Sequence, residues 1–408
     1  MLIQFNFKNY KAFSEETSLN MISSSIKEHM TNVITPPQKF ADSLLKVVAI
    51  YGANASGKSS VIEAFEFMKE AVSKSFMLSS VNKNLHLKQF AFQDQKTNSL
   101  FEVYIRTKSG EYQYGFEMNS KSDIMSEWLF KRDMRYKEKY VPVFERNGTE
   151  ISHSKIKELK IIQDKIKDSS LVLSVLAGLT IKEIQDVYEW FTETPIIDFG
   201  NPSYESIHST YIDEKIEDSL FQMEIVKFLN AISVPILKIN VEKNTRDNQE
   251  YYRISSVYDT PRGPMEIPFK DESSGTQKVF SMFFELQEVF LKGGVICIDE
   301  LDAKLHPLLL RYIIDLFHDP DTNPKNAQLI YTTHDNYTLT NDVFRRDQIW
   351  FVEKKSDLSS ELYSLVEYKL EEDRSVRNDA SYHKDYLLGK YGGVPILKGF
   401  NMWGTDHD

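Results

Sequence analysis

Residues 44–59 read LLKVVAIYGANASGKS, and this stretch decides the fold class. Its first half, residues 44–51, is nearly continuous in apolar residues, as expected of a strand that is buried on both faces of a sheet. Its second half, residues 52–59, matches the pattern G-x-x-x-x-G-K-[ST]. Apolar residues at three- and four-residue steps then predict an amphipathic helix: Val61, Phe65, Met68 and Val72. A strand, a glycine loop and a helix in this order favour a phosphate-binding loop (P-loop) over an ordinary Gly/Ser-rich turn.

The P-loop offers several kinds of phosphate ligand. Its glycines let successive backbone N–H groups face a β-phosphate at the positive end of the following helix. Lys58 adds a positive charge for the β- and γ-phosphates, and the Ser59 hydroxyl is a ligand for Mg²⁺. The expected nucleotide-binding residues are Gly52, Ala53, Asn54, Ala55, Ser56, Gly57, Lys58, Ser59 and Ser60.

A second motif, VICIDE at residues 295–300, is an apolar strand that ends in two acids. We expect Asp299 to hold Mg²⁺, usually through water, and Glu300 to act as the general base that polarises an attacking water. An acidic turn after a strand is the competing interpretation, and the upstream P-loop weighs against it.

Two further motifs are weaker on their own. Residues 271–278, DESSGTQK, precede an apolar helix, and such a start can offer donors to a γ-phosphate or can be an ordinary N-cap. Residues 329–335, LIYTTHD, place His334 directly after a buried strand. His334 could position a γ-phosphate or be a structural histidine.

The order of these four motifs resembles ABC-type ATPases of the SMC/RecF and OLD kind. GANASGKS is similar to their G-x-N-x-x-G-K-S form, SSGTQ to a variant signature motif, VICIDE to Walker B and TTHD to the switch histidine. The chain is similar in particular to the AAA-15/AAA-21 group, which serves bacterial abortive-infection and anti-phage systems. This closer resemblance rests on ELDAKLHP, QIWFVEK and YLLGKYGGVP, at residues 300–307, 348–354 and 386–395.

The resemblance implies an α/β P-loop head with a mixed central sheet, an antiparallel β subdomain and an inserted helical subdomain. It also implies ATP and Mg²⁺ as ligands, hydrolysis of ATP, and Lys58, Glu300 and His334 as the catalytic set. In such ATPases two heads enclose the nucleotides, so Ser273 and Gly275 of one copy would complete the site of another. A shift of one residue in the alignment would select Ser274 in place of Ser273.

Two features depart from the ABC pattern. Residues 305–306 are Leu-His, where many SMC heads have Leu-Asp in the D-loop. No single glutamine stands out for the Q-loop, for which Gln89 and Gln93 are both candidates.

Periodicity divides the chain into three parts. Residues 1–150 and 235–408 are expected to form the two halves of the head, and residues 151–234, mostly helical in pattern, an inserted subdomain. The predicted strands are residues 2–7, 101–105, 112–118, 235–241, 251–258, 294–298, 327–332, 349–353 and 362–368. The other predicted helices are residues 181–191, 276–291 and 307–317.

Composition limits the function classes. With 408 residues, 41% of them hydrophobic and 12% aromatic, the chain is expected to fold. A formal charge of −11 excludes a surface that is basic all over, so nucleic acid could bind only at local patches. Basic clusters at residues 131–139 and 155–167 are interpreted as solvated surface. The single cysteine, Cys297, lies in an apolar run and is expected to be a small buried residue.

The sequence also suggests a location and partners. No export signal or membrane-spanning stretch is apparent, so a cytoplasmic protein is expected. Only residues 369–408 follow the last predicted strand, too few for an added nuclease domain. We therefore expect a self-associating sensor or scaffold ATPase that controls a separate nuclease or toxin. A RecF/SMC-like DNA-repair ATPase is the alternative.

Overall fold

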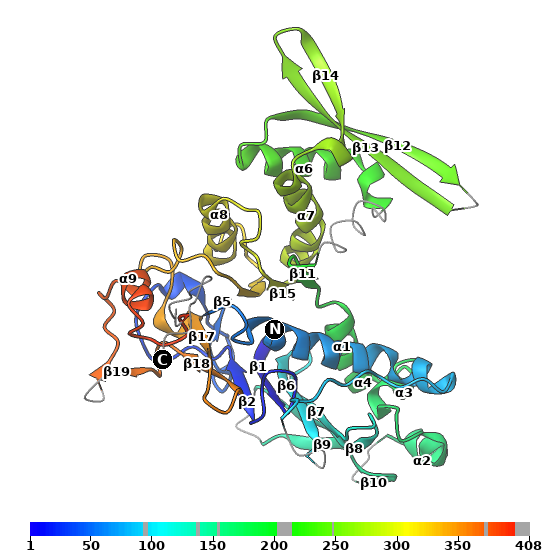
Figure 1. Ribbon diagram of the computed structural model, residues 1–408. Helices are drawn as coiled ribbons and strands as arrows, with labels where there is room; N and C mark the ends of the chain where they lie inside the picture. Colours follow the sequence, from blue (N-terminus) through cyan, green and yellow to red (C-terminus); the bar gives the residue numbers. More distant parts are fainter. Residues whose placement is uncertain are drawn as a thin grey trace, which may run out of the picture.

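The computed structural model describes residues 1–92, 97–135, 139–152, 156–201, 214–246, 249–370 and 374–395. Three larger sheets organise this part of the chain, and helices separate or cover them (Figure 1). The candidate Q-loop residue Gln93 lies outside the described residues, as do Lys137 and Lys155 of the basic clusters.

A six-stranded sheet with the order β11–β15–β16–β5–β17–β18 forms the centre. Neighbouring strands are parallel from β11 to β17, and β18 runs antiparallel to β17. Every residue of β5, β15 and β16 is buried, which agrees with their continuous apolar sequences. The predicted mixed central sheet is therefore confirmed. The strands are Ile196–Asp198 (β11), Val295–Asp299 (β15), Gln328–Thr332 (β16), Val47–Gly52 (β5), Ile349–Lys354 (β17) and Ser360–Ser364 (β18).

Two strand predictions were wrong in detail. The apolar run at residues 44–51 is not one strand, because β4 (Leu44–Leu45) pairs with β3 (Val33–Ile34) and β5 begins only at Val47. Lys46 separates them, and its ammonium donates a hydrogen bond to the carbonyl of His318 at 3.2 Å. The last predicted strand, residues 362–368, lies two residues too late at its start and runs past the end of β18 at Ser364.

A seven-stranded antiparallel sheet with the order β10–β9–β8–β7–β6–β1–β2 lies on one side of the molecule. The hairpin predicted at residues 101–118 is confirmed as β6 and β7, but it belongs to this larger sheet. The strands are Leu2–Lys8 (β1), Thr17–Asn20 (β2), Ser99–Arg106 (β6), Glu111–Met118 (β7), Ile124–Arg132 (β8), Val141–Asn147 (β9) and Glu150–Ser152 (β10).

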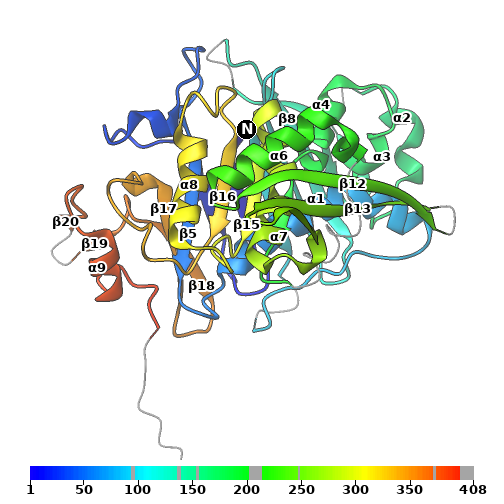
Figure 2. The ribbon, with the colours of Figure 1, turned by 90° about the horizontal axis from the view of Figure 1, so that it is seen from above.

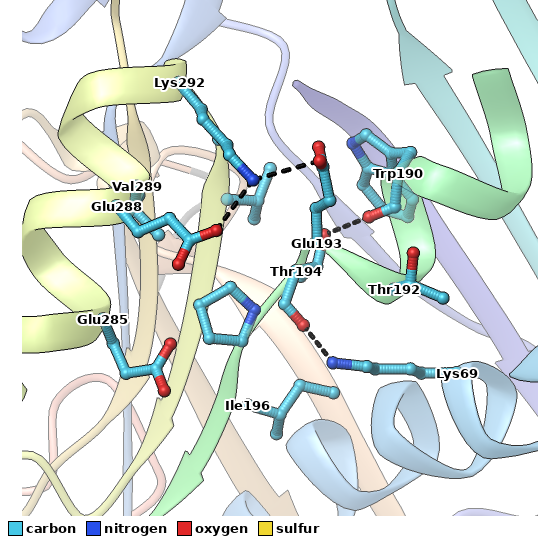
Figure 3. A pocket seen from close by; sticks show the side chains of 13 residues that line it. Lys69, Trp190, Thr192, Glu193, Thr194, Ile196, Glu285, Glu288, Val289 and Lys292 are labelled. Carbon is cyan, nitrogen blue, oxygen red and sulfur yellow. Dashed lines mark hydrogen bonds and ion pairs between the residues drawn. The ribbon is translucent and has the colours of Figure 1, made fainter. Parts of the chain in front are cut away.

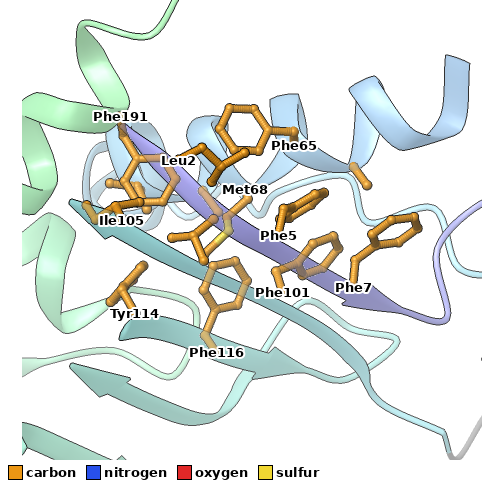
Figure 4. Packing of buried hydrophobic residues seen from close by; sticks show 14 of the residues in the cluster. Leu2, Phe5, Phe7, Phe65, Met68, Phe101, Ile105, Tyr114, Phe116 and Phe191 are labelled. Carbon is orange, nitrogen blue, oxygen red and sulfur yellow. The ribbon is translucent and has the colours of Figure 1, made fainter. Parts of the chain in front are cut away.

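Helix α1 (Lys58–Ser80) packs on the antiparallel sheet (Figure 4) and shares its core with residues of the central sheet. Its buried side chains share one core with aromatic residues of the antiparallel sheet, among them Phe5 and Phe101. Val48 and Ile50 of β5 enter the same core. The alternate residues of β5 face the opposite side of the central sheet, where they pack in a second core with α7 (Ser274–Lys292) and α8 (Pro307–His318).

Helix α7 also supports a small outlying module (Figures 1 and 2). Val279, Phe280 and Phe283 of α7 pack with α6 and with the three-stranded antiparallel sheet β12–β13–β14. The elements of the module are Glu214–Glu217 (η3), Ser219–Ala231 (α6), Ile236–Arg246 (β12), Gln249–Thr260 (β13) and Gly263–Pro268 (β14). The two strands predicted at residues 235–241 and 251–258 are confirmed within it.

The middle block, residues 151–234, contributes to several parts of the molecule. The predicted amphipathic helix is confirmed as α4 (Lys182–Thr192), and α4 packs against α1 together with α3 (Val172–Leu176). Strand β11 of the same block joins the central sheet, and α6 joins the outlying module. The domain boundaries at residues 150/151 and 234/235 stay predictions.

The remaining elements are short. They are Met30–Asn32 (η1), Leu159–Ile162 (α2), Gln163–Lys165 (η2), Phe269–Asp271 (η4), Arg346–Gln348 (η5), Lys369–Leu370 (β19), Arg374–Ser375 (β20) and Tyr382–Leu387 (α9). Cys297 is buried, as predicted. No helix in the described part of the chain is both long enough and apolar enough to cross a membrane.

Candidate nucleotide-binding site

The P-loop joins the carboxyl end of β5 to the first residue of α1. Gly57 caps the helix with a φ of 107°, and a Cβ added there would lie 2.8 Å from Ser360 Oγ and 2.9 Å from Ala12 Cβ. A Cβ added to Gly52 would lie 2.5 Å from the carbonyl oxygen of Val352. Both glycines are therefore required by close contacts, and Gly57 also by its left-handed backbone.

The Lys58 side chain is buried within the P-loop. Its Nζ donates to the carbonyl oxygens of Gly52 at 2.9 Å and Ala53 at 3.0 Å. Burial lowers the pKa of Lys58, and nearby Asp299, Glu300 and Asp302 oppose that shift through their negative charges. The ammonium thus lies close to Asp299, the predicted Mg²⁺ ligand, and to Glu300, the predicted general base.

Thr332, at the end of β16, joins the two acids of the Walker B motif. Its hydroxyl donates to the buried Asp299 carboxylate and accepts the backbone N–H of Glu300 at 2.9 Å. Glu300 has a φ of 52°, so the chain turns sharply at the end of β15. Thr332 is the first residue of the TTHD motif, in which only His334 was predicted to act at the site.

His334 is held near the same acids. Its backbone N–H donates to both carboxylate oxygens of Asp302 at 3.2 Å. Desolvation lowers the pKa of the His334 imidazole, as does the Lys58 ammonium, while Asp302 and the Walker B acids oppose the shift. The structure therefore brings His334 together with Lys58, Asp299 and Glu300. Asp302 is a further site residue that was not predicted, although it is the third acid of the segment IDELD, residues 298–302.

The signature residues lie at the start of α7, apart from the P-loop of the same chain. Ser273 is the N-cap of α7, and its hydroxyl accepts the Thr276 N–H at 3.2 Å. A Cβ on Gly275 would lie 3.2 Å from the carbonyl oxygen of Lys304, in the loop that follows β15. Among the described residues, no hydrogen bond joins Ser273, Ser274 or Gly275 to residues 52–59.

Lys278, one turn further along α7, is fully buried against that loop. Its ammonium donates to the carbonyl oxygens of Leu301, at 2.9 Å, and Ala303. The same ammonium lies 4.0 Å from the ring centroid of Phe199, a cation–π contact. Lys278 therefore fastens the signature helix to the chain segment that follows Glu300.

Residues 198–201 form another side of the site, which the sequence analysis did not anticipate. Strand β11 pairs in parallel with β15, and Asp198 lies opposite Asp299 in the register. The available signal in the sequence was the short apolar run of β11, which ends at Asp198, but this run also fits a helical block.

Gln89, one of the two Q-loop candidates, donates to the Thr97 carbonyl at 3.0 Å, beside β6.

Three basic residues of the first cluster form ion pairs. Lys131 forms an ion pair with Glu183 at 3.1 Å, and Arg132 pairs with Glu111. Arg135 pairs with Asp133 at 2.6 Å. The interpretation of both clusters as solvated surface stays a prediction.

Fold and site together define a P-loop nucleotide-binding protein with Walker A and Walker B segments on one mixed sheet. A family model described as "AAA domain, putative AbiEii toxin, Type IV TA system" matches residues 47–340. The chain therefore belongs to this AAA-21 family, and the resemblance seen in its motifs is confirmed. None of the curated proteins matches the chain. Among solved structures, the SMC head domain from Thermotoga maritima is similar, with a TM-score of 0.42 and 15% identity over 89% of this chain and 98% of that chain.

Proposed function

We propose that the chain binds ATP with Mg²⁺ and hydrolyses it to ADP and phosphate. The proposal rests on one observation: Lys58, Asp299 and Glu300 lie together at one edge of the central sheet. The Thr332 hydroxyl links the two acids. The chain's membership in the AAA-21 family supports the same activity.

The residues present fit a magnesium nucleotide. The Ser56 hydroxyl is buried and has no hydrogen-bond partner in the described structure, and the Lys58 ammonium contacts only loop carbonyls where phosphates would lie. No group of three His, Cys, Asp or Glu side chains among the described residues could hold a metal ion. Mg²⁺ would be bound through Ser59, Asp299, water and phosphate oxygens, because Mg²⁺ keeps several such ligands in nucleotide sites.

Each residue then has a defined task. Lys58 binds the β- and γ-phosphates, and Ser59 and Asp299 hold Mg²⁺, which offsets negative charge on the phosphates. Glu300 takes a proton from the water whose oxygen attacks the γ-phosphorus, while the bond to the bridging oxygen of ADP breaks. His334 donates a hydrogen bond toward the γ-phosphate.

We also propose that a second copy of the chain completes the site. Ser273 and Ser274 are both exposed at the positive end of α7, where backbone N–H groups favour an anion. Ser273 already caps its own helix, whereas the Ser274 hydroxyl has no hydrogen-bond partner in the described structure. We therefore assign the phosphate contact in the opposite subunit to Ser274 and Gly275.

In the cell, the proposed role is that of a cytoplasmic sensor or scaffold in an anti-phage system, with a separate nuclease or toxin as effector. The family description, which names a putative AbiEii toxin of a type IV toxin–antitoxin system, supports a place in such a system. The sensor role and the separate effector rest on the motif resemblance alone. Nuclease activity of the purified chain that survives Glu300→Gln would contradict a separate effector.

The activity itself is tested with the purified full chain. Phosphate release and ATP affinity are measured for the wild type and for Lys58→Ala, with Mg²⁺ and with excess EDTA. We expect Mg²⁺-dependent turnover by the wild type and loss of ATP binding in the variant. Equal ATP affinity of both proteins would refute the assignment of the P-loop.

A further inference from the structure

We infer that Gly200 is a positioning residue for Glu300: the turn after β11 sets the direction of the Glu300 carboxylate. The inference rests on the proposed function, in which Glu300 is the base. It adds a part of the site that neither the P-loop nor the Walker B motif contains.

The turn runs directly beside Glu300. The β11–β15 pairing places Asp198 opposite Asp299, and it is extended by a hydrogen bond from the Phe199 N–H to the Asp299 carbonyl at 3.1 Å. A Cβ added to Gly200 would lie 2.9 Å from Glu300 Oε2 and 3.0 Å from its Cδ. The carboxylate therefore lies against the Cα of Gly200, without room for a methyl group between them.

The carboxylate contact, and not the backbone, explains the glycine. Gly200 is absent from the residues with a left-handed φ, so its conformation suits any amino acid. The turn is fixed independently by the Asp198 carboxylate, which accepts the N–H groups of Gly200 at 2.9 Å and Asn201 at 3.2 Å. Alanine at residue 200 would displace mainly the Glu300 carboxylate, and its Cβ would also lie 3.2 Å from Asp198 Oδ1, which would have to yield by a few tenths of an ångström.

Both ends of the β11 segment are fastened to helices that carry nucleotide-binding residues. At its start, Lys69 of α1 donates to the Thr194 carbonyl at 2.6 Å, and Lys292 of α7 pairs with Glu193 at 3.0 Å. These contacts border a pocket of about 320 Å³ between the two helices (Figure 3). At its end, the Phe199 ring lies under the Lys278 ammonium of α7. A shift of α1 or α7 would therefore be passed to Gly200 and so to Glu300.

The test is Gly200→Ala, with Gly178→Ala as the matched control because a Cβ at Gly178 meets nothing within 4 Å. We expect Gly200→Ala to lower kcat roughly 10- to 100-fold, the scale of a misplaced catalytic group, with KM for ATP and Tm unchanged. The control should keep wild-type kcat. If Gly200 acts through Glu300, adding Gly200→Ala to Glu300→Gln should cause no further loss.

Two results would overturn the inference: wild-type kcat in Gly200→Ala, or an equal fractional loss in the Glu300→Gln background. Crystal structures of the wild type and Gly200→Ala provide a readout that needs no turnover. The Glu300 carboxylate should occupy a different rotamer in the variant, and an unmoved carboxylate would refute the inference. A wild type that does not hydrolyse ATP would instead refute the proposed function.

Discussion

Thr332 shows how much of the site depends on single polar atoms. The side chain is fully buried, and one hydroxyl serves both the Asp299 carboxylate and the Glu300 N–H. A buried carboxylate has lost its hydration by water, and if it also loses a hydrogen-bond donor nothing offsets that free-energy cost. The position of Asp299 and the turn at Glu300 are therefore set by the neighbouring strand β16.

Replacing Thr332 with valine keeps the shape and removes the hydroxyl. We expect the free energy of unfolding to fall by about 1–3 kcal/mol, because the Asp299 carboxylate and the Glu300 N–H both lose a partner. Denaturant unfolding of Thr332→Val and of the control Thr332→Ser measures this. Equal stability of all three proteins would show that the hydroxyl is not needed.

The two signature serines should separate stability from turnover. Ser273→Ala removes the N-cap of α7 and should lower the free energy of unfolding by about 1 kcal/mol. Ser274→Ala leaves the cap intact and should lower ATP turnover without changing Tm. Thermal unfolding and phosphate release, measured on both variants, decide which of the two serines contacts the phosphate. A loss of turnover in Ser273→Ala, with normal turnover in Ser274→Ala, would assign that contact to Ser273.

At the scale of elements, the sequence predicted those segments whose pattern is local. The stripe on α1 and the apolar runs of β15 and β16 are continuous, and the structure confirms them. Strand β11 has only three residues, and the residues that pair with it on β15 lie far along the chain, so no local pattern could identify it. The same reason hid the contribution of Gly200 to the site.

The attachment of α7 to the loop after β15 can be tested through Lys278. Its ammonium donates to the carbonyls of Leu301 and Ala303 and, at 3.5 Å, of Glu300, so Lys278→Met should lower the free energy of unfolding by roughly 1.5–3 kcal/mol. Lys83→Met, at an exposed residue, is the control. Denaturant midpoints compare the two variants, and a loss of the same size in both would contradict the proposed attachment.

At the scale of the whole molecule, buried polar groups join segments that are distant in sequence. His318 at the end of α8 is buried, and its Nε2 lies 2.9 Å from Gln348 Nε2. The Gln348 amide nitrogen also donates to the Val47 carbonyl at 3.0 Å, so it acts as a donor and His318 Nε2 accepts. Only the neutral imidazole can make this contact.

Acid should therefore weaken the fold through His318. Burial lowers the pKa of His318 from 6.5 to about 3, with a smaller effect of the charged Lys46, His29 and Arg311. Between these pH values the unfolded chain binds a proton that the folded chain does not, so stability falls as pH decreases below about 6.5, by up to about 1.4 kcal/mol per unit. Urea unfolding between about pH 7 and pH 5 should show a shallower slope for His318→Gln. Identical slopes would contradict the buried neutral histidine.

The central claim is that one chain supplies Lys58 to bind the nucleotide phosphates, Asp299 to hold Mg²⁺ and Glu300 as the general base. It is tested most directly by measuring ATP affinity and single-turnover hydrolysis on the same preparations of wild type and Glu300→Gln. We predict that the variant binds ATP with an affinity close to that of the wild type and hydrolyses it at least about 100-fold more slowly, because only the base is lost. Hydrolysis by Glu300→Gln at the wild-type rate would contradict the account.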